Sequence, residues 1–292
     1  MSTAATKFAF DNKGQGDHDP LLYQANGQIE PITGFEAVGD AQIRSFHEHG
    51  FLAVARLFNE DDLAAAHQGL DDLLDRNVPG HPDDMVLLEH SARDSVDTLT
   101  RQQLHDAVRK LSYFCEHEPR LGALSRHRHI LGIVERIIGG KTKMIQDMAL
   151  LKPPRIGREK PWHQDHAYFD YPIHTPIVGV WIALDRTTPE NGCMHVRPGW
   201  HRKGPIIHFK RRDWQICDTD ILDQSEANCM AVPLDPGGAL FFSSLLPHGT
   251  PINLSPQRRR ALQYHYAPVD TKPLERDERL DLFGSEGKNV SC

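Results

Sequence analysis

The stretch PWHQDHAYF (161–169) places His163, Asp165 and His166 within four positions of one another. The chain has 18 histidines in 292 residues, so such a cluster does not by itself establish a metal site. In a β-strand, residues i and i+2 point to the same face, so His163 and Asp165 can reach one point while Gln164 faces away. Imidazole together with carboxylate suits a divalent transition metal better than calcium or magnesium.

A third ligand must then come from a distant strand. The best candidate is His248 in LLPHGTPIN (245–253), which follows the apolar stretch GALFF (238–242) and lies 248 − 163 = 85 residues after His163. Two histidines and one carboxylate on one face leave three coordination positions open, as in the facial triad of non-haem Fe(II) oxygenases. A single His-x-Asp is more often a pair of ordinary surface or core residues, so further evidence is needed.

The segment after His248 supplies that evidence. Arg258, Arg259 and Arg260 stand directly before the strand-like run ALQYHYA (261–267). An iron oxygenase that uses 2-oxoglutarate needs a cation for the distal carboxylate of this cosubstrate, and arginine pairs with carboxylates bidentately and stays charged. Alternation along a strand puts Arg259 on the face opposite to Arg258 and Arg260. The alternative is a fully solvated run of charge.

The composition excludes several classes of protein. A formal net charge of −7 argues against a nucleic-acid partner, which would require a basic face. No run of 18 apolar residues occurs and the first residues lack an apolar leader segment, so no membrane segment is expected. Five scattered cysteines without a CxxC motif indicate reduced thiols in a cytoplasmic protein.

Hydrophobic patterning predicts helices first and strands later. Residues 1–40 are expected to form an N-terminal extended arm, and residues 41–292 a single catalytic domain with N-terminal helices. A strand over 51–55, a helix capped by Asn59 and a helix over 131–138 stopped by Gly139 are predicted. Later strands are predicted at 144–151, 178–184, 193–197, 238–242 and 261–267.

Short strands separated by Gly/Pro turns indicate a mainly β protein with flanking helices, built as a sandwich or jelly roll. Two long segments fit neither the helical nor the strand pattern, namely 81–104 and 201–214. Such segments are often functional lids, and in the second one Arg211 or Arg212 would be the expected contact for an anionic substrate. His195, Arg197 and Trp200 are candidates for the mouth of the site.

Three motifs in the order HQDHAYF (163–169), GVWIALDRTTPENGCMHVRPGWH (179–201) and HGTPINLSPQRRRAL (248–262) resemble the phytanoyl-CoA dioxygenase (PhyH-like) family of Fe(II)/2-oxoglutarate-dependent oxygenases. The resemblance covers roughly residues 40–270. It implies a double-stranded β-helix, the cupin-like jelly roll. It also implies that His163, Asp165 and His248 bind the iron and that Arg259 binds 2-oxoglutarate.

The same resemblance implies further positions around the cosubstrate. Met148 and Trp181 match residues that line the 2-oxoglutarate pocket, although both also suit plain core packing. Thr250 stands where a hydroxyl supports the same carboxylate. Lys110 matches a lysine that lies on a helix in the family, and Arg109 competes with it if the register slips by one.

The implied reaction is the oxidation, by hydroxylation or a related outcome, of a small or medium-sized organic metabolite with Fe(II), 2-oxoglutarate and O₂, releasing succinate and CO₂. Two alternatives stay open: a cupin-like metal enzyme that does not use 2-oxoglutarate, and a non-catalytic binding module on the same fold. Arg259 discriminates between the first alternative and the dioxygenase. The sequence specifies neither the substrate nor the oligomeric state.

Overall fold

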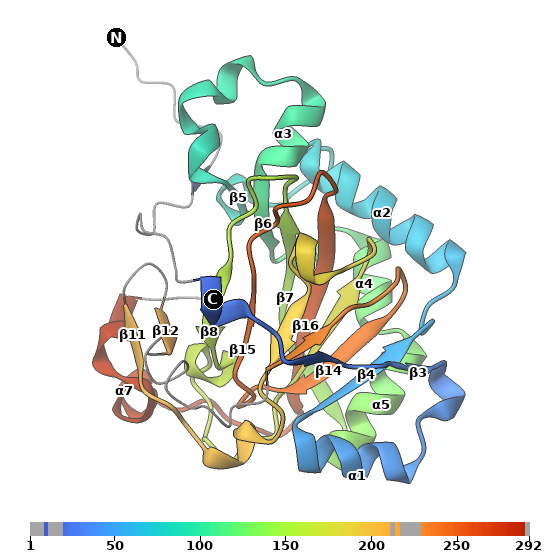
Figure 1. The fold of residues 1–292 in the computed structure, drawn as a ribbon, viewed down its shortest axis with the longest axis vertical. Coiled ribbons are helices and arrows are strands. Elements are labelled where there is room, and N and C mark those ends of the chain that lie inside the picture. The colour runs from blue at the N-terminus through green and yellow to red at the C-terminus, as the bar shows by residue number, and fades with distance from the viewer. Residues whose placement is uncertain (1–8, 11–19, 211–213, 217–228, 290–292) are drawn as a thin grey trace.

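The computed structural model describes residues 9–10, 20–210, 214–216 and 229–289. Within these residues, two β-sheets form the centre of the molecule (Figure 1). The large sheet has the spatial order β1 (Ala9–Phe10), β5 (Val86–Leu88), β6 (Val108–Ser112), β7 (Thr142–Lys152), β16 (Arg259–Pro268), β9 (Val178–Ala183), β14 (Ala239–Ser243), β4 (Phe51–Ala55) and β3 (Ile32–Thr33). The small sheet has the order β2 (Gly27–Gln28), β13 (Met230–Val232), β10 (Met194–Val196), β15 (His248–Thr250) and β8 (Lys160–His163).

Eight of these strands form a double-stranded β-helix. Along the chain, β7, β9, β14 and β16 pair side by side in the large sheet, while β8, β10, β13 and β15 pair in the small sheet. The pairs β16–β7, β16–β9, β14–β9, β15–β8, β10–β15 and β10–β13 are all antiparallel. The chain therefore passes back and forth between two facing sheets, and the predicted jelly-roll fold is confirmed.

The helices lie mainly on the outer face of the large sheet. They are α1 (Asp40–His49), α2 (Glu60–Leu74), α3 (Arg101–Ala107), α4 (Pro119–Ser125), α5 (Arg128–Ile138) and α7 (Arg276–Phe283). Short 3₁₀ helices are η1 (Pro20–Tyr23), η2 (Phe35–Ala37), η3 (Asp83–Met85), η4 (His90–Thr98), η5 (Asp165–Tyr168), η6 (Pro189–Asn191), η7 (Trp200–Lys203) and η8 (Ser285–Asn289).

Helix α5 shows why this layer forms. Its residues Ile130, Ile133, Val134 and Ile137 repeat at helical spacing and are almost fully buried. They belong to one apolar cluster with the outward-facing residues of β7, β9 and β16 and with residues of α2 and α4. Burying such a stripe against a sheet is a dominant favourable term in folding. In Figure 1, α1, α2, α4 and α5 accordingly lie together beside the large sheet.

Several predicted boundaries are confirmed. The side chain of Asn59 accepts a hydrogen bond from the backbone N–H of Asp62 and caps α2. Gly139 ends α5 in the left-handed conformation, with φ of 81°. The predicted strands correspond to β4, β7, β9, β10, β14 and β16.

The described part of the N-terminal segment contributes three short strands, of which β1 pairs in parallel with β5. β2 pairs in parallel with β13 at the edge of the small sheet, and β3 pairs in parallel with β4 at the edge of the large sheet. No helix of the described residues is long and apolar enough to cross a membrane.

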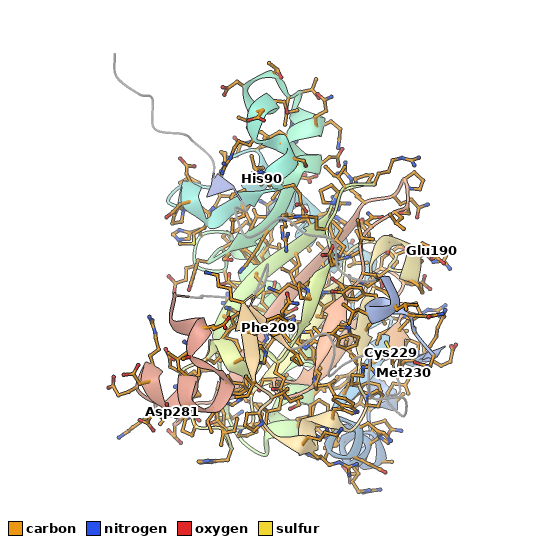
Figure 2. All side chains as sticks on the ribbon, turned by 60° about the vertical axis from the view of Figure 1, so that its left-hand side comes forward. His90, Glu190, Phe209, Cys229, Met230 and Asp281 are labelled. Atoms are coloured by element: carbon orange, nitrogen blue, oxygen red, sulfur yellow. The ribbon has the colours of Figure 1, made fainter. Side chains whose placement is uncertain are left out.

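The two segments proposed as irregular lids contain regular structure. Residues 81–104 include η3, η4, the start of α3 and strand β5, which pairs with β6 inside the large sheet. The prediction of a patternless segment was wrong here because three-residue strands carry too little periodicity to be recognised. The second segment contains η7 and the hairpin of β11 (His208–Lys210) and β12 (Trp214–Ile216). Figure 2 brings forward the side with Phe209 of β11 and Asp281 of α7. Arg211 and Arg212 lie outside the described residues.

Candidate metal centre

Two neighbouring strands of the small sheet bring the candidate ligands together. His163 is the last residue of β8, and it pairs directly with His248, the first residue of β15. Directly opposed residues in an antiparallel pair share a face, so both imidazoles point into the space between the sheets. Asp165 is not on the strand as predicted, because η5 begins at this residue. The turn nevertheless carries its carboxylate back to the two histidines.

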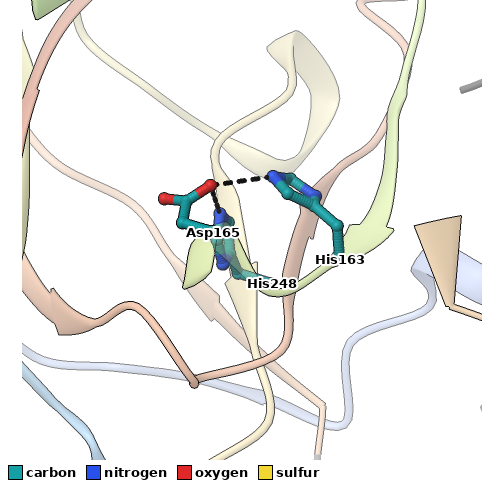
Figure 3. Close-up of side chains that lie close together, drawn as sticks. All are labelled: His163, Asp165 and His248. Carbon is teal, nitrogen blue, oxygen red and sulfur yellow. Dashed lines mark ion pairs between the residues drawn. The ribbon is translucent and has the colours of Figure 1, made fainter. Parts of the chain in front are cut away.

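The three side chains converge on one point (Figure 3). Oδ1 of Asp165 lies 3.2 Å from Nε2 of His163 and 3.5 Å from Nε2 of His248. One ligand atom from each of the three residues lies within 4.8 Å of the others, and all three residues are buried. A nitrogen, nitrogen and oxygen donor set at this spacing fits a non-haem iron ion.

Hydrogen bonds fix which ring nitrogen faces the metal position. Nδ1–H of His163 donates to the carbonyl of Pro161 over 2.7 Å, and Nδ1–H of His248 donates to the carbonyl of Leu246 over 2.9 Å. Each Nε2 is therefore left with its lone pair, the form that binds a metal. Burial first, and then the neighbouring His248, lower the pKa of His163 to about 4, which keeps this imidazole neutral at ordinary pH.

The second oxygen of Asp165 is held from the large sheet. Oδ2 lies 2.7 Å from Nε2 of His265 and 3.2 Å from Nε2 of Gln263, both on β16 and both buried. Burial alone would raise the pKa of Asp165, but the neighbouring His248 and His265 hold it well below its usual range. Asp165 therefore presents one ionised oxygen to the metal position and has the other one anchored.

The arginine run divides as predicted. Arg259 is buried, donates to the carbonyl of Leu150 over 2.9 Å and lies 5.5 Å from the ring centre of Trp181. Arg258 instead forms an ion pair with Asp106, and Arg260 forms one with Asp185. Burial lowers the pKa of Arg259 to about 10, so its guanidinium remains charged at neutral pH.

A cavity of about 460 Å³ joins the metal position to Arg259. It is lined by all the residues predicted to surround 2-oxoglutarate, and these are Lys110, Met148, Trp181, Thr250 and Arg259. Within the described residues, Nε1 of Trp181, Oγ1 of Thr250 and Nε of Arg259 are buried without a hydrogen-bond partner. Buried donors without partners are costly, and an anionic oxygen between them would satisfy them.

One sequence expectation about this cavity needs correction. Lys110 lies on strand β6 and not on a helix. Both Arg109 and Lys110 line the cavity, so either side chain can reach the cosubstrate position. The helix was expected from the family resemblance, but β6 pairs with β7 and continues the large sheet.

Residues expected at the mouth lie elsewhere. His195 lies on the outer side of the small sheet, with Nδ1 at 3.9 Å from Sγ of Cys229. Arg197 lies over the rings of Trp162 and Trp200. Val196 pairs with His248 and therefore faces the cavity. His195 and Arg197 are its two neighbours along the chain, and successive residues of a strand point to opposite faces, so both face away from the cavity.

Gln164 does face away from the metal position as the strand alternation predicted. Its side chain donates to the carbonyls of Gly204 and Leu245 and accepts from the N–H of Ile206. It ties the turn after β8 to two loops. Gln263 and His265 were missed, although their alternation with Leu262, Tyr264 and Tyr266 in the sequence could have placed them on the inner face with Arg259.

Two histidines and a carboxylate on a double-stranded β-helix, with a buried arginine in the same cavity, define a non-haem iron oxygenase. The model of the Phytanoyl-CoA dioxygenase (PhyH) family matches residues 46–261, which is 261 − 46 + 1 = 216 of the 292 residues. The chain belongs to this family.

Individual relatives agree with this assignment. The chain is 25% identical over 247 residues to a probable phytanoyl-CoA dioxygenase of Caenorhabditis elegans, covering 78% of this chain and 75% of that protein. It is 42% identical over 122 residues to a methylphosphonate hydroxylase of Gimesia maris, covering 41% of this chain and 43% of that protein. The epimerase SnoN, solved with Fe³⁺, α-ketoglutarate and nogalamycin RO, has the same fold, with a TM-score of 0.64, 16% identity and coverage of 84% and 90%.

The expected enzyme class is therefore confirmed. The chain is an iron- and 2-oxoglutarate-dependent dioxygenase, with O₂ as the oxidant. This class excludes the alternatives of a cupin-like enzyme without 2-oxoglutarate and of a non-catalytic module.

Proposed function

We propose that this enzyme hydroxylates a small or medium-sized organic metabolite, with His163, Asp165 and His248 as the iron ligands. The observation that carries the proposal is the common cavity that these three residues share with Arg259. Bound iron, with 2-oxoglutarate and O₂, supplies the oxidising chemistry. Overall, substrate C–H, 2-oxoglutarate and O₂ become C–OH, succinate and CO₂. The retained carboxylate of Asp165 favours hydroxylation over halogenation, because related halogenases lack it.

The protein's own residues position the reactants in this proposal. Arg259 holds the distal carboxylate of 2-oxoglutarate, and the hydroxyl of Thr250 and the indole N–H of Trp181 donate to the same group. Their unpartnered buried polar atoms support this role. Met148 provides an apolar wall of the cavity, and Lys110 adds positive charge from β6.

The fixed tautomers of His163 and His248 and the anchored Asp165 keep three donors in place before any metal arrives. Preorganised ligands lower the cost of binding. The apolar and aromatic residues around the cavity exclude water from the reacting carbon.

The test is a metabolite screen for substrate-stimulated succinate formation, with Fe(II) and 2-oxoglutarate saturating. We expect at least one compound to raise succinate release well above the uncoupled rate and to be recovered with one added oxygen atom. Release of succinate without any oxygenated product from every compound would contradict hydroxylation. Methylphosphonate belongs in the first set of compounds, because a methylphosphonate hydroxylase shares 42% identity with this chain over 122 residues.

We also propose a cytoplasmic location. The cysteines within the described residues, Cys115, Cys193 and Cys229, are buried and unpaired, as expected in a reducing compartment. Fractionation of the native cells tests this location, and recovery in an organelle or in an exported fraction would contradict it.

A further inference from the structure

Lys160 is one of six basic residues that line the cavity, and it lies on the wall opposite to Arg259. Lys160 is the first residue of β8 in the small sheet, whereas Arg259 is on β16 in the large sheet, and both line the cavity. The half-buried position of Lys160 beside a metal ligand is unusual for a lysine, because lysines usually extend their ammonium groups into bulk water.

An irregularity in the strand pairing turns Lys160 into the cavity. Lys160 pairs with Thr250 and His163 pairs with His248, with a register shift between the two pairs. His163 and Lys160 are three positions apart and would face opposite sides of a regular strand. The shift puts both on the cavity side, as β-bulges beside active sites commonly do. Gly249 permits the close approach, since a Cβ there would lie 3.1 Å from the carbonyl oxygen of Lys160.

The ammonium group lies on the His163 side of the cavity. Nζ of Lys160 is 5.6 Å from the ring centre of Tyr168, and that ring centre is 5.8 Å from the centre of the His163 ring. The charge of Lys160 is also among the causes that lower the pKa of His163, after burial and His248. Arg259 by contrast rests on Trp181 and the carbonyl of Leu150.

The electrostatic partners of Lys160 also differ from those of Arg109 and Arg158. Arg158 forms an ion pair with Glu89 over 3.1 Å, and Arg109 lies 3.9 Å from the same carboxylate. Lys152 donates to the carbonyl of Arg158. Lys160 has no carboxylate within ion-pair distance among the residues that the structure describes. A cation in a cavity with apolar walls raises the local concentration of anions.

We propose that Lys160 binds an oxyanion group of the substrate, a phosphonate or a carboxylate, beside the metal position. This inference rests on the proposed function and narrows its substrate class to small organic anions. Arg259 and Lys160 then separate two anions in one cavity, with 2-oxoglutarate anchored from the large sheet and the substrate anchored from the small sheet. The carbon that is oxidised lies within a few bonds of the oxyanion, because Lys160 and His163 are on the same short strand.

The test measures binding and not only turnover. The anaerobic complex with Fe(II) and 2-oxoglutarate is titrated with methylphosphonate, with propionate and with the neutral dimethyl methylphosphonate, and perturbation of its visible charge-transfer band gives a Kd for each probe. We expect methylphosphonate or propionate to perturb the band. The titration in which the band changes then shows whether the site prefers a phosphonate or a carboxylate. The neutral ester should bind at least about tenfold more weakly, as expected when a charge-assisted hydrogen bond is lost.

Variants assign the effect to Lys160. Lys160→Ala should raise the Kd of the responding oxyanion about ten- to a hundredfold while changing the Kd of 2-oxoglutarate less than about twofold. Lys160→Arg should recover most of the affinity. Lys143→Ala is the matched control, because Nζ of Lys143 also lies over a tyrosine ring, at 5.9 Å from Tyr171, but outside the cavity lining.

Three results would overturn the proposal: equal binding of the neutral ester, a loss of 2-oxoglutarate affinity in Lys160→Ala, or no response to either oxyanion at about 10 mM, well above typical substrate constants. Failure of the proposed function is a separate outcome, since the band would then not form in the wild-type protein before any probe is added.

Discussion

Nε2 of His265 lies 2.7 Å from Oδ2 of Asp165, and both side chains are almost completely buried. This contact joins the two sheets, because His265 belongs to β16 and Asp165 follows β8. It leaves only Oδ1 of the carboxylate directed at His163 and His248. The carboxylate is therefore oriented before metal binding.

From this contact we expect His265→Leu to weaken iron binding. Partners that orient metal ligands typically contribute about ten- to a hundredfold in metal affinity. The measurement is the Kd for Fe(II) by anaerobic titration with a competing chelator. His105→Leu is the control, because Nε2 of His105 lies 2.8 Å from Asp75 in a partly buried histidine–carboxylate pair that does not line the cavity. Unchanged iron affinity in His265→Leu would show that the contact has no orienting role.

Arg259→Ala is expected to raise the 2-oxoglutarate requirement. Losing a charge-assisted pair costs about 1 to 3 kcal/mol, or roughly 5- to 150-fold in Kd. Arg258→Ala and Arg260→Ala should change it little, because these residues pair with Asp106 and Asp185. The Kd of 2-oxoglutarate in the anaerobic Fe(II) complex gives the answer. If Arg258→Ala had the largest effect, the inward position of Arg259 would not be the cosubstrate anchor.

Stability should fall in acid partly through His195. Burial first, and then Lys152, lower the pKa of His195 to about 4, below the value near 6.5 of an unfolded histidine. The unfolded state therefore binds the proton more readily, so the neutral form contributes stability above pH 6.5 that is lost as the pH falls through about 4. One such group changes the free energy of unfolding by at most about 1.4 kcal/mol per pH unit.

Urea unfolding of the chelator-treated protein at several pH values between about 8 and 4 measures this effect. The wild type should lose stability more steeply than His195→Leu over this range, and the two should have parallel profiles above pH 7. Parallel profiles throughout would mean that His195 is not held neutral by the fold.

Most residues of the site could be predicted from the sequence, but the end of strand β8 and the orientation of Lys160 could not. The convergence of His163, Asp165 and His248 and the inward position of Arg259 could be predicted, because strand alternation and motif spacing indicate which side chains share a face. Asp165 was assigned to a strand, yet the strand ends at His163 and a 3₁₀ helix begins at Asp165. This boundary could not be predicted, because two residues are too few to distinguish the end of a strand from its continuation. The inward turn of Lys160 could not be predicted either, because a register shift depends on the pairing partner and not on local residues.

The most direct test of the central claim is an anaerobic titration of the metal-free protein with Fe(II) and 2-oxoglutarate, followed by visible absorbance. We predict a charge-transfer band that needs both components, saturates at one iron per chain and is absent in His163→Ala, Asp165→Ala and His248→Ala. Absence of the band in the wild-type protein at saturating concentrations, or its full retention in any of the three variants, would contradict the assignment of this site.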